Sequence, residues 1–196
     1  MKVLGEKKKG LLFVLSAPAG TGKTTLVRML LEEFDCVVQS VSFTTRQPRP
    51  MEVPEKDYHF ITTSEFERKI QAGEFLEHAK VFGQYYGTSR KLLADLQSQG
   101  KHVILVIDTQ GALFLKKTLD AVFIFIHPPS IDVLRERLSR RKSETSDMIE
   151  SRLSWAKKEI SLAGEYDYSI VNDRLETAYD VLRSILIAEE HRINHL

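Results

Sequence analysis

Short apolar runs recur along the chain and are separated by amphipathic segments. The runs are rich in β-branched and aromatic residues and stand at 11–16, 36–42, 102–107, 121–126 and 168–172. Most of them are continuous rather than alternating, which is typical of parallel strands that are covered on both faces. The pattern therefore predicts a parallel sheet of about five strands.

Helical patterns follow most of these runs. The sequence TTLVRMLLEEF comes after the first run, GALFLKK after the third and SIDVLRERLSRR after the fourth, where Ser130 is a suitable N-cap. A last helical pattern, LETAYDVLRSILIAEEHRI, closes the sequence. Strands that alternate with helices predict an α/β fold, in which helices flank a doubly wound parallel sheet.

Residues 43–100 break this alternation. They contain three prolines and short segments typical of antiparallel strands, with helices expected near 64–72 and 89–99. We predict that they form an inserted small mixed β/α subdomain above the carboxyl edge of the sheet, where open α/β sheets bind ligands. A polar segment at 140–150 leads into a helix expected at 147–163, which indicates a mobile helical lid.

The length and composition suit one domain. The chain has 196 residues, of which 42% are hydrophobic, enough for a sizeable core. We expect a single domain over 1–196, with a core at about 10–42, 101–136 and 164–190, the insertion at about 43–100 and the lid at about 137–163.

Charge and cysteine content limit the binding partners and the cellular location that we expect. The formal net charge is +1, so no global field favours nucleic acid or an anionic membrane. The single cysteine, Cys36, excludes a disulfide within the chain and favours a reducing, cytoplasmic location. We expect Cys36 to be a small apolar residue at a strand edge. No apolar stretch is long enough for a signal peptide or a membrane span, and no obligatory protein partner is inferred.

The segment SAPAGTGKTT at 16–25 directly follows the first apolar run. It matches the phosphate-loop pattern G-x-x-x-x-G-K-[ST] except at the first glycine, which is Ala17 here. In such a loop, backbone N–H groups and the new helix terminus hold phosphates. Lys23 would contact the β- and γ-phosphates, and Thr24 would hold Mg²⁺. A left-handed backbone at Ala17 would be strained, and the alternative is a plain strand–helix turn.

The insertion offers a second set of candidate ligands. Arg46 and Arg49 flank a proline turn, and guanidinium groups grip phosphate bidentately, with Tyr58 as a further hydroxyl. The alternative is an ordinary exposed loop. Glu77 is a carboxylate in an otherwise apolar strand and needs a donor partner. That partner is either a structural arginine or a ligand with paired N–H donors, such as guanine at N1 and the 2-amino group.

These motifs together resemble the guanylate kinase family over about residues 10 to 190. The matching segments, in order, are APAGTGKTT, SFTTRQPRP, DYHF, GEFLEHAKVFGQYYGTS, VIDTQGA, HPPSIDVLRERL and EYDYSIVND. The resemblance implies a P-loop kinase fold with a GMP-binding insertion and a lid. It also implies transfer of the γ-phosphoryl group of ATP to GMP, and also to dGMP, with Mg²⁺.

The resemblance also implies roles for individual residues. The catalytic set is Lys23, Arg46, Arg137, Arg141 and Arg152, the last three closing over the transferring phosphate. The ATP site is Ala17, Pro18, Ala19, Gly20, Thr21, Gly22, Lys23, Thr24 and Thr25, with Asn172 and Asp173 near the adenine. The residues implied to bind the GMP phosphate are Arg46, Arg49, Tyr58 and Tyr86. Those implied to bind guanine are Glu77, Ser42, Thr88 and Asp108. Mg²⁺ is implied at Thr24, through the phosphates, and at Asp108, through water.

The sequence departs from the family pattern at several places. Ala17 and Ala19 replace glycine and serine in the loop, Met51 and Glu55 replace glycines after the arginine pair, His78 replaces a tryptophan, and Val106 replaces an acidic residue. The departure at Val106 leaves Asp108 to orient the waters of the metal by itself.

Other functions remain open from the sequence. A kinase of AMP, UMP or dTMP is the nearest alternative, although Glu77 with Asp108 argues against adenine, which has no N1–H donor. A non-catalytic protein-binding domain of the same fold is another, against which Lys23 and Thr24 argue. The basic stretch 135–141 is either a solvated helix face, a nucleic-acid patch or part of the phosphate closure. We assign Arg137 and Arg141 to closure and leave Arg135 and Arg140 as surface charges.

Overall fold

A computed structural model describes residues 3–50, 52–81, 83–140 and 145–193. Its main sheet has five parallel strands in the order β2-β7-β1-β8-β9. The strands are β1 (Leu12–Ser16), β2 (Val37–Gln39), β7 (His102–Val106), β8 (Val122–His127) and β9 (Tyr168–Val171). The predicted α/β class with a parallel five-stranded sheet is therefore confirmed.

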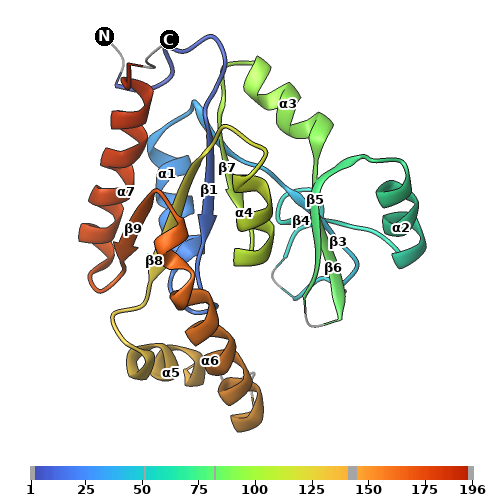
Figure 1. Ribbon diagram of the computed structural model, residues 1–196, viewed down its shortest axis with the longest axis vertical. Helices are drawn as coiled ribbons and strands as arrows, with labels where there is room; N and C mark the ends of the chain where they lie inside the picture. Colours follow the sequence, from blue (N-terminus) through green and yellow to red (C-terminus); the bar gives the residue numbers. More distant parts are fainter. Residues whose placement is uncertain (1–2, 51, 82, 141–144, 194–196) are drawn as a thin grey trace.

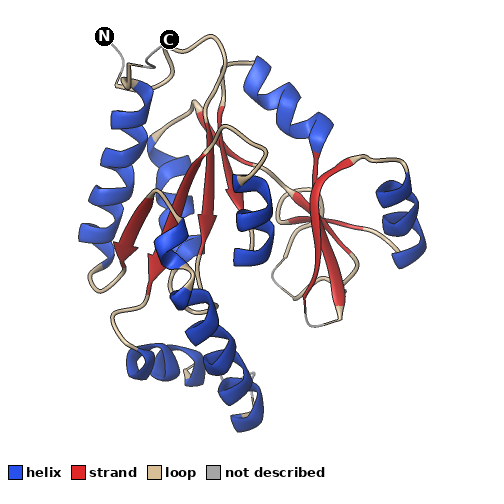
Figure 2. Cartoon of the chain, in the orientation of Figure 1, coloured by secondary structure: helices blue, strands red, loops and turns tan. Residues whose placement is uncertain are grey.

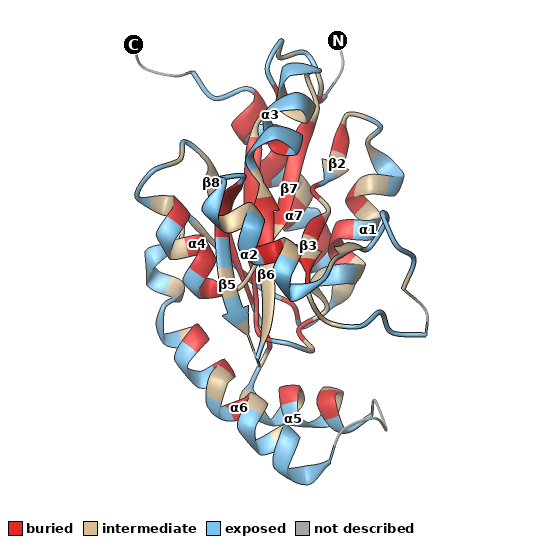
Figure 3. Cartoon of the chain, turned by 90° about the vertical axis from the view of Figure 1, so that its right-hand side faces the viewer, coloured by how far each residue is buried: buried red, intermediate tan, exposed pale blue. Residues whose placement is uncertain are grey.

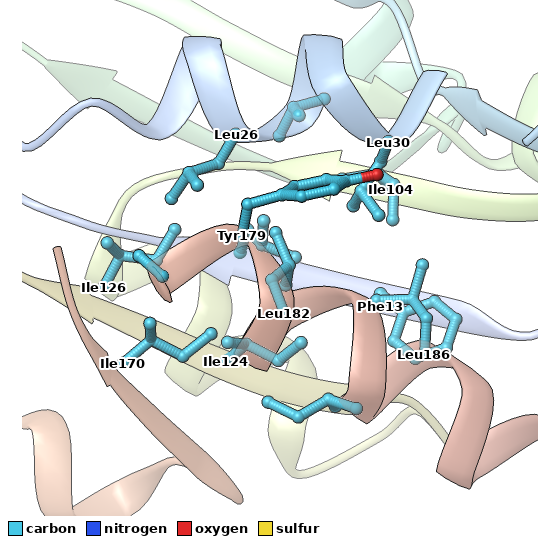
Figure 4. Packing of buried hydrophobic residues seen from close by; sticks show 14 of the residues in the cluster. Phe13, Leu26, Leu30, Ile104, Ile124, Ile126, Ile170, Tyr179, Leu182 and Leu186 are labelled. Atoms are coloured by element: carbon cyan, nitrogen blue, oxygen red, sulfur yellow. The ribbon is translucent and has the colours of Figure 1, made fainter. Parts of the chain in front are cut away.

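Helices cover both faces of this sheet (Figure 1). On one face, α1 (Lys23–Glu33) and α7 (Leu175–Glu190) pack against alternate side chains such as Phe13 and Leu15. Figure 4 shows this core, in which Tyr179 and Leu182 of α7 meet Leu26 of α1. On the other face, α3 (Arg90–Ser98) and α4 (Thr109–Lys116) cover the remaining side chains of the strands. Burial on both faces explains why the strands read as continuous apolar runs.

A second, mixed sheet lies beside the main one (Figure 2). Its order is β4-β3-β6-β5, with β3 and β4 parallel and the other pairs antiparallel. The elements are β3 (Ser42–Thr44), β4 (Tyr58–Phe60), α2 (Thr63–Gln71), β5 (Phe75–Val81) and β6 (Gln84–Ser89). Phe66 of α2 is buried and stacks on Phe75 and Tyr85, which holds the helix against the sheet. Both helices expected in this region are present.

The prediction of one continuous strand over 36–42 is wrong. Strand β2 ends at Gln39, and Ser42 already begins β3 of the second sheet. The N–H of Ser40 still donates to the carbonyl of Ile104 on β7, whereas Ser42 pairs with Tyr58. An apolar run indicates extended backbone, but it does not say which strand pairs with it, so the change of sheet was not visible in the pattern.

The helices after β8 form a separate small layer. Helix α5 (Ile131–Ser139) and helix α6 (Ser146–Ser161) share a cluster that includes Leu134, Leu138 and Leu153. Ser130 and Thr145 cap the two helices through their hydroxyls, as expected for Ser130. A 3₁₀ turn, η1 (Ala163–Glu165), leads back to β9. Figures 1 and 3 show α5 and α6 beyond the carboxyl ends of the main strands, at the end of the molecule opposite the termini. In the described part of the chain, no helix is long and apolar enough to cross a membrane.

Glu55 stands in an unusual backbone conformation. Its φ is 66°, and it is the one non-glycine residue with positive φ among those that the structure describes. Its carboxylate lies 2.6 Å from Nδ1 of His59, across the turn that leads into β4. Glycine is the residue of the family pattern at this position, and Glu55 replaces it. The positive φ gives that departure a physical cost.

Substitution of Glu55 tests this strain. Both Glu55→Gly and Glu55→Ala remove the contact with His59, but only glycine accepts the left-handed region freely. We expect the glycine variant to be about 1 kcal/mol more stable than the alanine variant, measured by urea denaturation. At an ordinary position the order is reversed, because glycine has the more flexible unfolded chain. An alanine variant of equal or greater stability would contradict a strained φ.

Candidate active site

The loop between β1 and α1 adopts the glycine conformations that a phosphate cradle requires. Gly20 and Gly22 have φ of 91° and 92°, and Gly22 is the N-cap of α1. Ala17 does not have positive φ, so the missing first glycine introduces no strain. The Ala17 side chain is 5% exposed and packs into the main core. The loop therefore retains its form with alanine at this place.

Asn172 fixes the loop from the opposite side. Its Nδ2 donates to the carbonyl of Thr21 at 2.7 Å, and its own backbone carbonyl accepts from Arg137 at 3.0 Å. A Cβ on Gly22 would lie 2.4 Å from that same Nδ2. Asn172, which follows β9, thus joins the loop to helix α5. Of the pair predicted near the adenine, Asn172 is buried and Asp173 is exposed.

Lys23 is the first residue of α1, and Thr24 follows it with an exposed side chain. The ammonium group of Lys23 donates to the carbonyl of Ala17 at 3.3 Å, across the mouth of the loop. Burial lowers the pKa of Lys23, while the nearby carboxylates of Glu159 and Asp108 act in the opposite direction. A desolvated cation beside the positive helix terminus is suited to binding phosphate.

Three residues predicted to bind the acceptor phosphate lie together at the second sheet, Tyr58 and Tyr86 on its strands and Arg46 in the loop after β3. The guanidinium of Arg46 is 4.9 Å from the ring centre of Tyr58, and the rings of Tyr58 and Tyr86 are 6.0 Å apart. Arg46 is also held by both oxygens of Glu52, each at 2.6 Å. This bidentate pair is the main reason that the pKa of Arg46 is raised above its ordinary value.

Glu52 is a member of this group that the sequence analysis missed. Besides Arg46, its carboxylate accepts from the backbone N–H of Arg49 at 2.9 Å. The Arg49 side chain is exposed and interacts electrostatically with the same carboxylate. The Glu52 carboxylate therefore lies between the two arginines, where an anionic ligand of both would bind. Its spacing of three and six residues from them in a proline-rich turn was the available signal.

A second group surrounds Glu77 on β5, which is 6% exposed. The hydroxyl of Thr88 donates to Oε1 of Glu77 at 2.6 Å, so the donor is a threonine and not the structural arginine considered from the sequence. Burial is the largest effect on Glu77 and raises its pKa to about 7, with Asp108 acting in the same direction and Thr88 against it. Strands β3 and β6 are antiparallel, and Phe43 pairs with Gly87. Ser42, which precedes Phe43, therefore lies next to Thr88, which pairs with Glu77.

Asp108 connects this group to the main sheet. It is the N-cap of α4, and its Oδ1 accepts from the N–H of Gly111 at 2.8 Å. A Cβ on Gly111 would lie 2.9 Å from Oε2 of Glu77, so only glycine allows so close an approach between α4 and β5. The four residues predicted for the base, Ser42, Glu77, Thr88 and Asp108, are thus brought together.

The structure describes some of the arginines predicted for the lid. Arg137 contacts the carbonyl of Asn172, and Arg152 is half-buried on α6. Arg135 and Arg140 are exposed and pair with Glu150 and Glu136, as surface charges do. Arg141 lies outside the described residues, as does Met51.

Glu159, in the last turn of α6, was not identified from the sequence. It is 6% exposed, and burial raises its pKa to about 7, with Lys23 and Asp108 as its electrostatic neighbours. The sequence around it reads as a solvated helix face, with two lysines directly before it. The signal was its spacing of three residues from Ala156 and six from Leu153, which places a carboxylate on the apolar face.

A cavity of about 1040 Å³ lies elsewhere, at the amino ends of the strands. Side chains of both charges line it, among them Lys7, Asp120 and Arg192. None of the predicted site residues lines this cavity, so the candidate site rests on the side-chain geometry described above.

Comparisons with known proteins agree with one another. A family model described as "Guanylate kinase" matches residues 9–189. A guanylate kinase from Protochlamydia amoebophila is 59% identical over 97% of this chain and 96% of its own length. One from Clostridium perfringens is 45% identical over 100% of this chain and 91% of its own. The crystal structure of guanylate kinase from Anaplasma phagocytophilum superposes with a TM-score of 0.79 at 41% identity, covering 95% of this chain and 89% of that one.

Proposed function

The chain belongs to the guanylate kinase family, and on this premise we propose that it transfers the γ-phosphoryl group of ATP to GMP, giving ADP and GDP. One observation carries the proposal within the structure. A buried carboxylate, Glu77, lies on the same small sheet as the cluster of Arg46, Tyr58 and Tyr86. The first suits the N–H edge of guanine, and the second suits a phosphate monoester.

On the donor side, the loop of residues 17–25 binds the ATP phosphates. Its N–H groups and the amino end of α1 face the phosphates, and Lys23 contacts the β- and γ-groups. Asn172 keeps the loop in place through Thr21. Asp173, which follows Asn172, lies near the adenine in this proposal.

On the acceptor side, Glu77 accepts from guanine N1 and the 2-amino group, with Ser42, Thr88 and Asp108 around the base. Arg46, Arg49, Tyr58 and Tyr86 hold the GMP phosphate. Because Glu52 already fills the fork of Arg46, the phosphate binds through the remaining donors of that guanidinium or displaces Glu52. Adenine lacks the N1–H donor, so it leaves the Glu77 carboxylate unsatisfied.

Catalysis then consists of alignment and charge neutralisation. The acceptor is already an anion near neutral pH, and phosphoryl transfer needs positioned cations more than a general base. Lys23 and Arg46 supply cations from the two sides, and Arg137, Arg141 and Arg152 from the lid. Closure of α5 and α6 excludes water, which strengthens these interactions and prevents hydrolysis of ATP.

Mg²⁺ belongs to this proposal as the cation that accompanies ATP. The hydroxyl of Thr24 at the start of α1 and the carboxylate of Asp108 are hard oxygen donors, which is the ligand type that Mg²⁺ prefers. When bound, Mg²⁺ neutralises phosphate charge and fixes the geometry of the triphosphate. Asp108 would act through water, since one of its oxygens already accepts from Gly111.

The proposal divides the chain by task. The core at about 10–42, 101–136 and 164–190 carries the donor site, the insertion at about 43–100 carries GMP, and about 137–163 forms the lid. ATP and GMP are the expected partners, with no nucleic acid, membrane or obligatory protein partner. A single half-buried cysteine, Cys36, supports the cytoplasm as the location.

The test is ADP formation from ATP and Mg²⁺, with GMP, dGMP, AMP, UMP and dTMP as separate acceptors. Turnover with GMP that is lost in Lys23→Ala is the expected result. Preference for AMP, UMP or dTMP would retain the kinase and overturn the guanine assignment. No turnover with any acceptor would favour the alternative function, a non-catalytic protein-binding domain of the same fold.

A further inference from the structure

The amino-terminal segment, residues 3–10, is packed into the fold. Leu4 is buried in the main core, and a Cβ on Gly5 would lie 2.9 Å from the Cβ of Cys36. The segment then passes the end of α7 and the start of β7 before the chain enters β1 (Figure 1). Buried polar contacts hold it there, and they centre on the first residue of β7.

That residue is His102, whose side chain is fully buried. The N–H of Leu11, just before β1, donates to Nδ1 of His102 at 3.0 Å. Nδ1 therefore carries no proton, and the one ring proton of the neutral imidazole is on Nε2. Nε2 lies 2.7 Å from Oε2 of Glu190, a buried carboxylate at the end of α7. This contact has the length of an ion pair but not the geometry of a hydrogen bond, and neither atom bonds to any other described group.

Glu190 connects His102 to the amino-terminal segment. Its second oxygen, Oε1, accepts from the backbone N–H groups of Glu6 at 2.8 Å and Lys7 at 3.2 Å. One carboxylate thus contacts the segment with one oxygen and the histidine with the other. Since His102 also accepts from the start of β1, the segment is held at both of its ends by one buried pair.

A second proton on His102 is incompatible with these contacts. It would have to bind Nδ1, where it would face the N–H of Leu11, so that two buried donors oppose each other and the contact is lost. Glu190 and Lys7 are the charged groups that face the ring. Burial lowers the pKa of His102; Glu190 acts against this effect and Lys7 adds to it. A released ring has the ordinary pKa of about 6.5, so the stabilisation is complete above that pH and decreases as the pH falls below it.

We propose that His102 and Glu190 form an acid-sensitive latch, which holds residues 3–10 against β7 and α7 near neutral pH and releases them when Nδ1 of His102 is protonated. The inference does not rest on the proposed function, because His102 lies at the amino end of β7 and Asp108 lies beyond its carboxyl end. The release is local, since β1 and β7 remain paired from Leu12 to Leu15. The segment is then the part of the fold that acid exposes first.

Hydrogen exchange of backbone amides at pH 7.5 and pH 5.0 tests the latch. Each exchange rate is divided by the rate of the unfolded chain at the same pH, which removes the direct effect of pH on the chemistry of exchange. We expect the protection of residues 4–11 to fall about tenfold at the lower pH. The protection of β8 should change by less than about twofold, because the core stays folded.

His102→Asn removes the titration and keeps a carbonyl oxygen near the place of Nδ1 as an acceptor for Leu11. Protection of the segment in this variant should be the same at both pH values. His191→Asn is the matched control, because His191 is exposed and also contacts the segment, with its Nε2 3.2 Å from the carbonyl oxygen of Val3. This control should keep the tenfold fall.

A second variant carries the test if His102→Asn does not fold. Glu190→Gln keeps an oxygen for the N–H groups of the segment and removes the negative charge that favours a protonated ring. The fall in protection should then begin at a lower pH than in the wild type. An unchanged midpoint would contradict the pairing of His102 with Glu190.

Three further results would overturn the inference. No fall in protection of the wild-type segment at pH 5.0 would mean that protonation does not open the latch. A fall that persists in His102→Asn would assign the effect to another group. An equal fall in β8 would mean that acid unfolds the whole domain and does not release the segment locally.

Discussion

Replacing Lys23 by methionine should lower kcat with ATP and GMP by about 10³-fold. Methionine keeps the length of the side chain and removes the ammonium, so the β- and γ-phosphates lose a cation that is already desolvated in the free protein. Charge stabilisation in a site of low dielectric constant depends strongly on each fixed cation. Steady-state measurement of ADP formation at saturating ATP and GMP gives the value.

Lys101→Met is the matched control for Lys23. Lys101 lies just before β7, near the end of the molecule away from the loop, where its ammonium donates to the carbonyl of Asp35. The control should retain wild-type kcat. A decrease of less than tenfold in Lys23→Met, with unchanged thermal stability, would remove Lys23 from the catalytic set.

Glu77→Gln is expected to lower kcat/KM for GMP by about 10²- to 10⁴-fold, because two charge-assisted hydrogen bonds of roughly 1.5–3 kcal/mol each are lost or weakened. The amide of glutamine offers one acceptor and presents a donor to the second N–H of guanine. The value of KM for ATP should change little, since Glu77 lies on the second sheet. Glu74→Gln, which removes an exposed carboxylate paired with Lys69 on the same subdomain, serves as the control.

The pH dependence gives a further check on Glu77. Burial raises its pKa to about 7, so in the free enzyme the carboxyl is mostly protonated at pH 6 and mostly ionised at pH 8. Guanine binding needs the ionised form, and kcat/KM for GMP should therefore rise with pH through about 7. Glu77→Gln lacks this group, and its profile should lose that rise. The ionisation of the GMP phosphate is common to both enzymes and cancels in the ratio of their profiles.

The fold was largely predictable because strands that are buried on both faces are continuous apolar runs. Residues 102–107 and 121–126 became β7 and β8 with changes of one residue at their ends. The change of sheet between Gln39 and Ser42 was not predictable, because pairing partners are decided by distant segments.

The conformation of the candidate site was predictable where a motif marks the residues, and not where only packing does. Gly20 and Gly22 stand in a recognisable pattern and have positive φ, and Lys23 begins α1, while the roles of these residues stay predictions. Glu52 and Glu159 stand in charged surroundings that read as solvated surface. Glu52 binds Arg46 through the turn after β3, and Glu159 has Lys23 only as an electrostatic neighbour, brought near by the end of α6. The sequence pattern carries no information on such encounters between elements.

The point at which β2 gives way to β3 has a consequence for how this enzyme fold can change its acceptor. The chain leaves the main sheet after Ser40 and returns to the core at α3, which begins at Arg90. Apart from Asp108, every residue proposed for GMP lies in that one uninterrupted stretch, while the proposed donor site is assembled from segments on either side of it. Grafting that one stretch from a related kinase would therefore exchange most of the proposed acceptor contacts together, while the segments proposed to bind ATP stay in place.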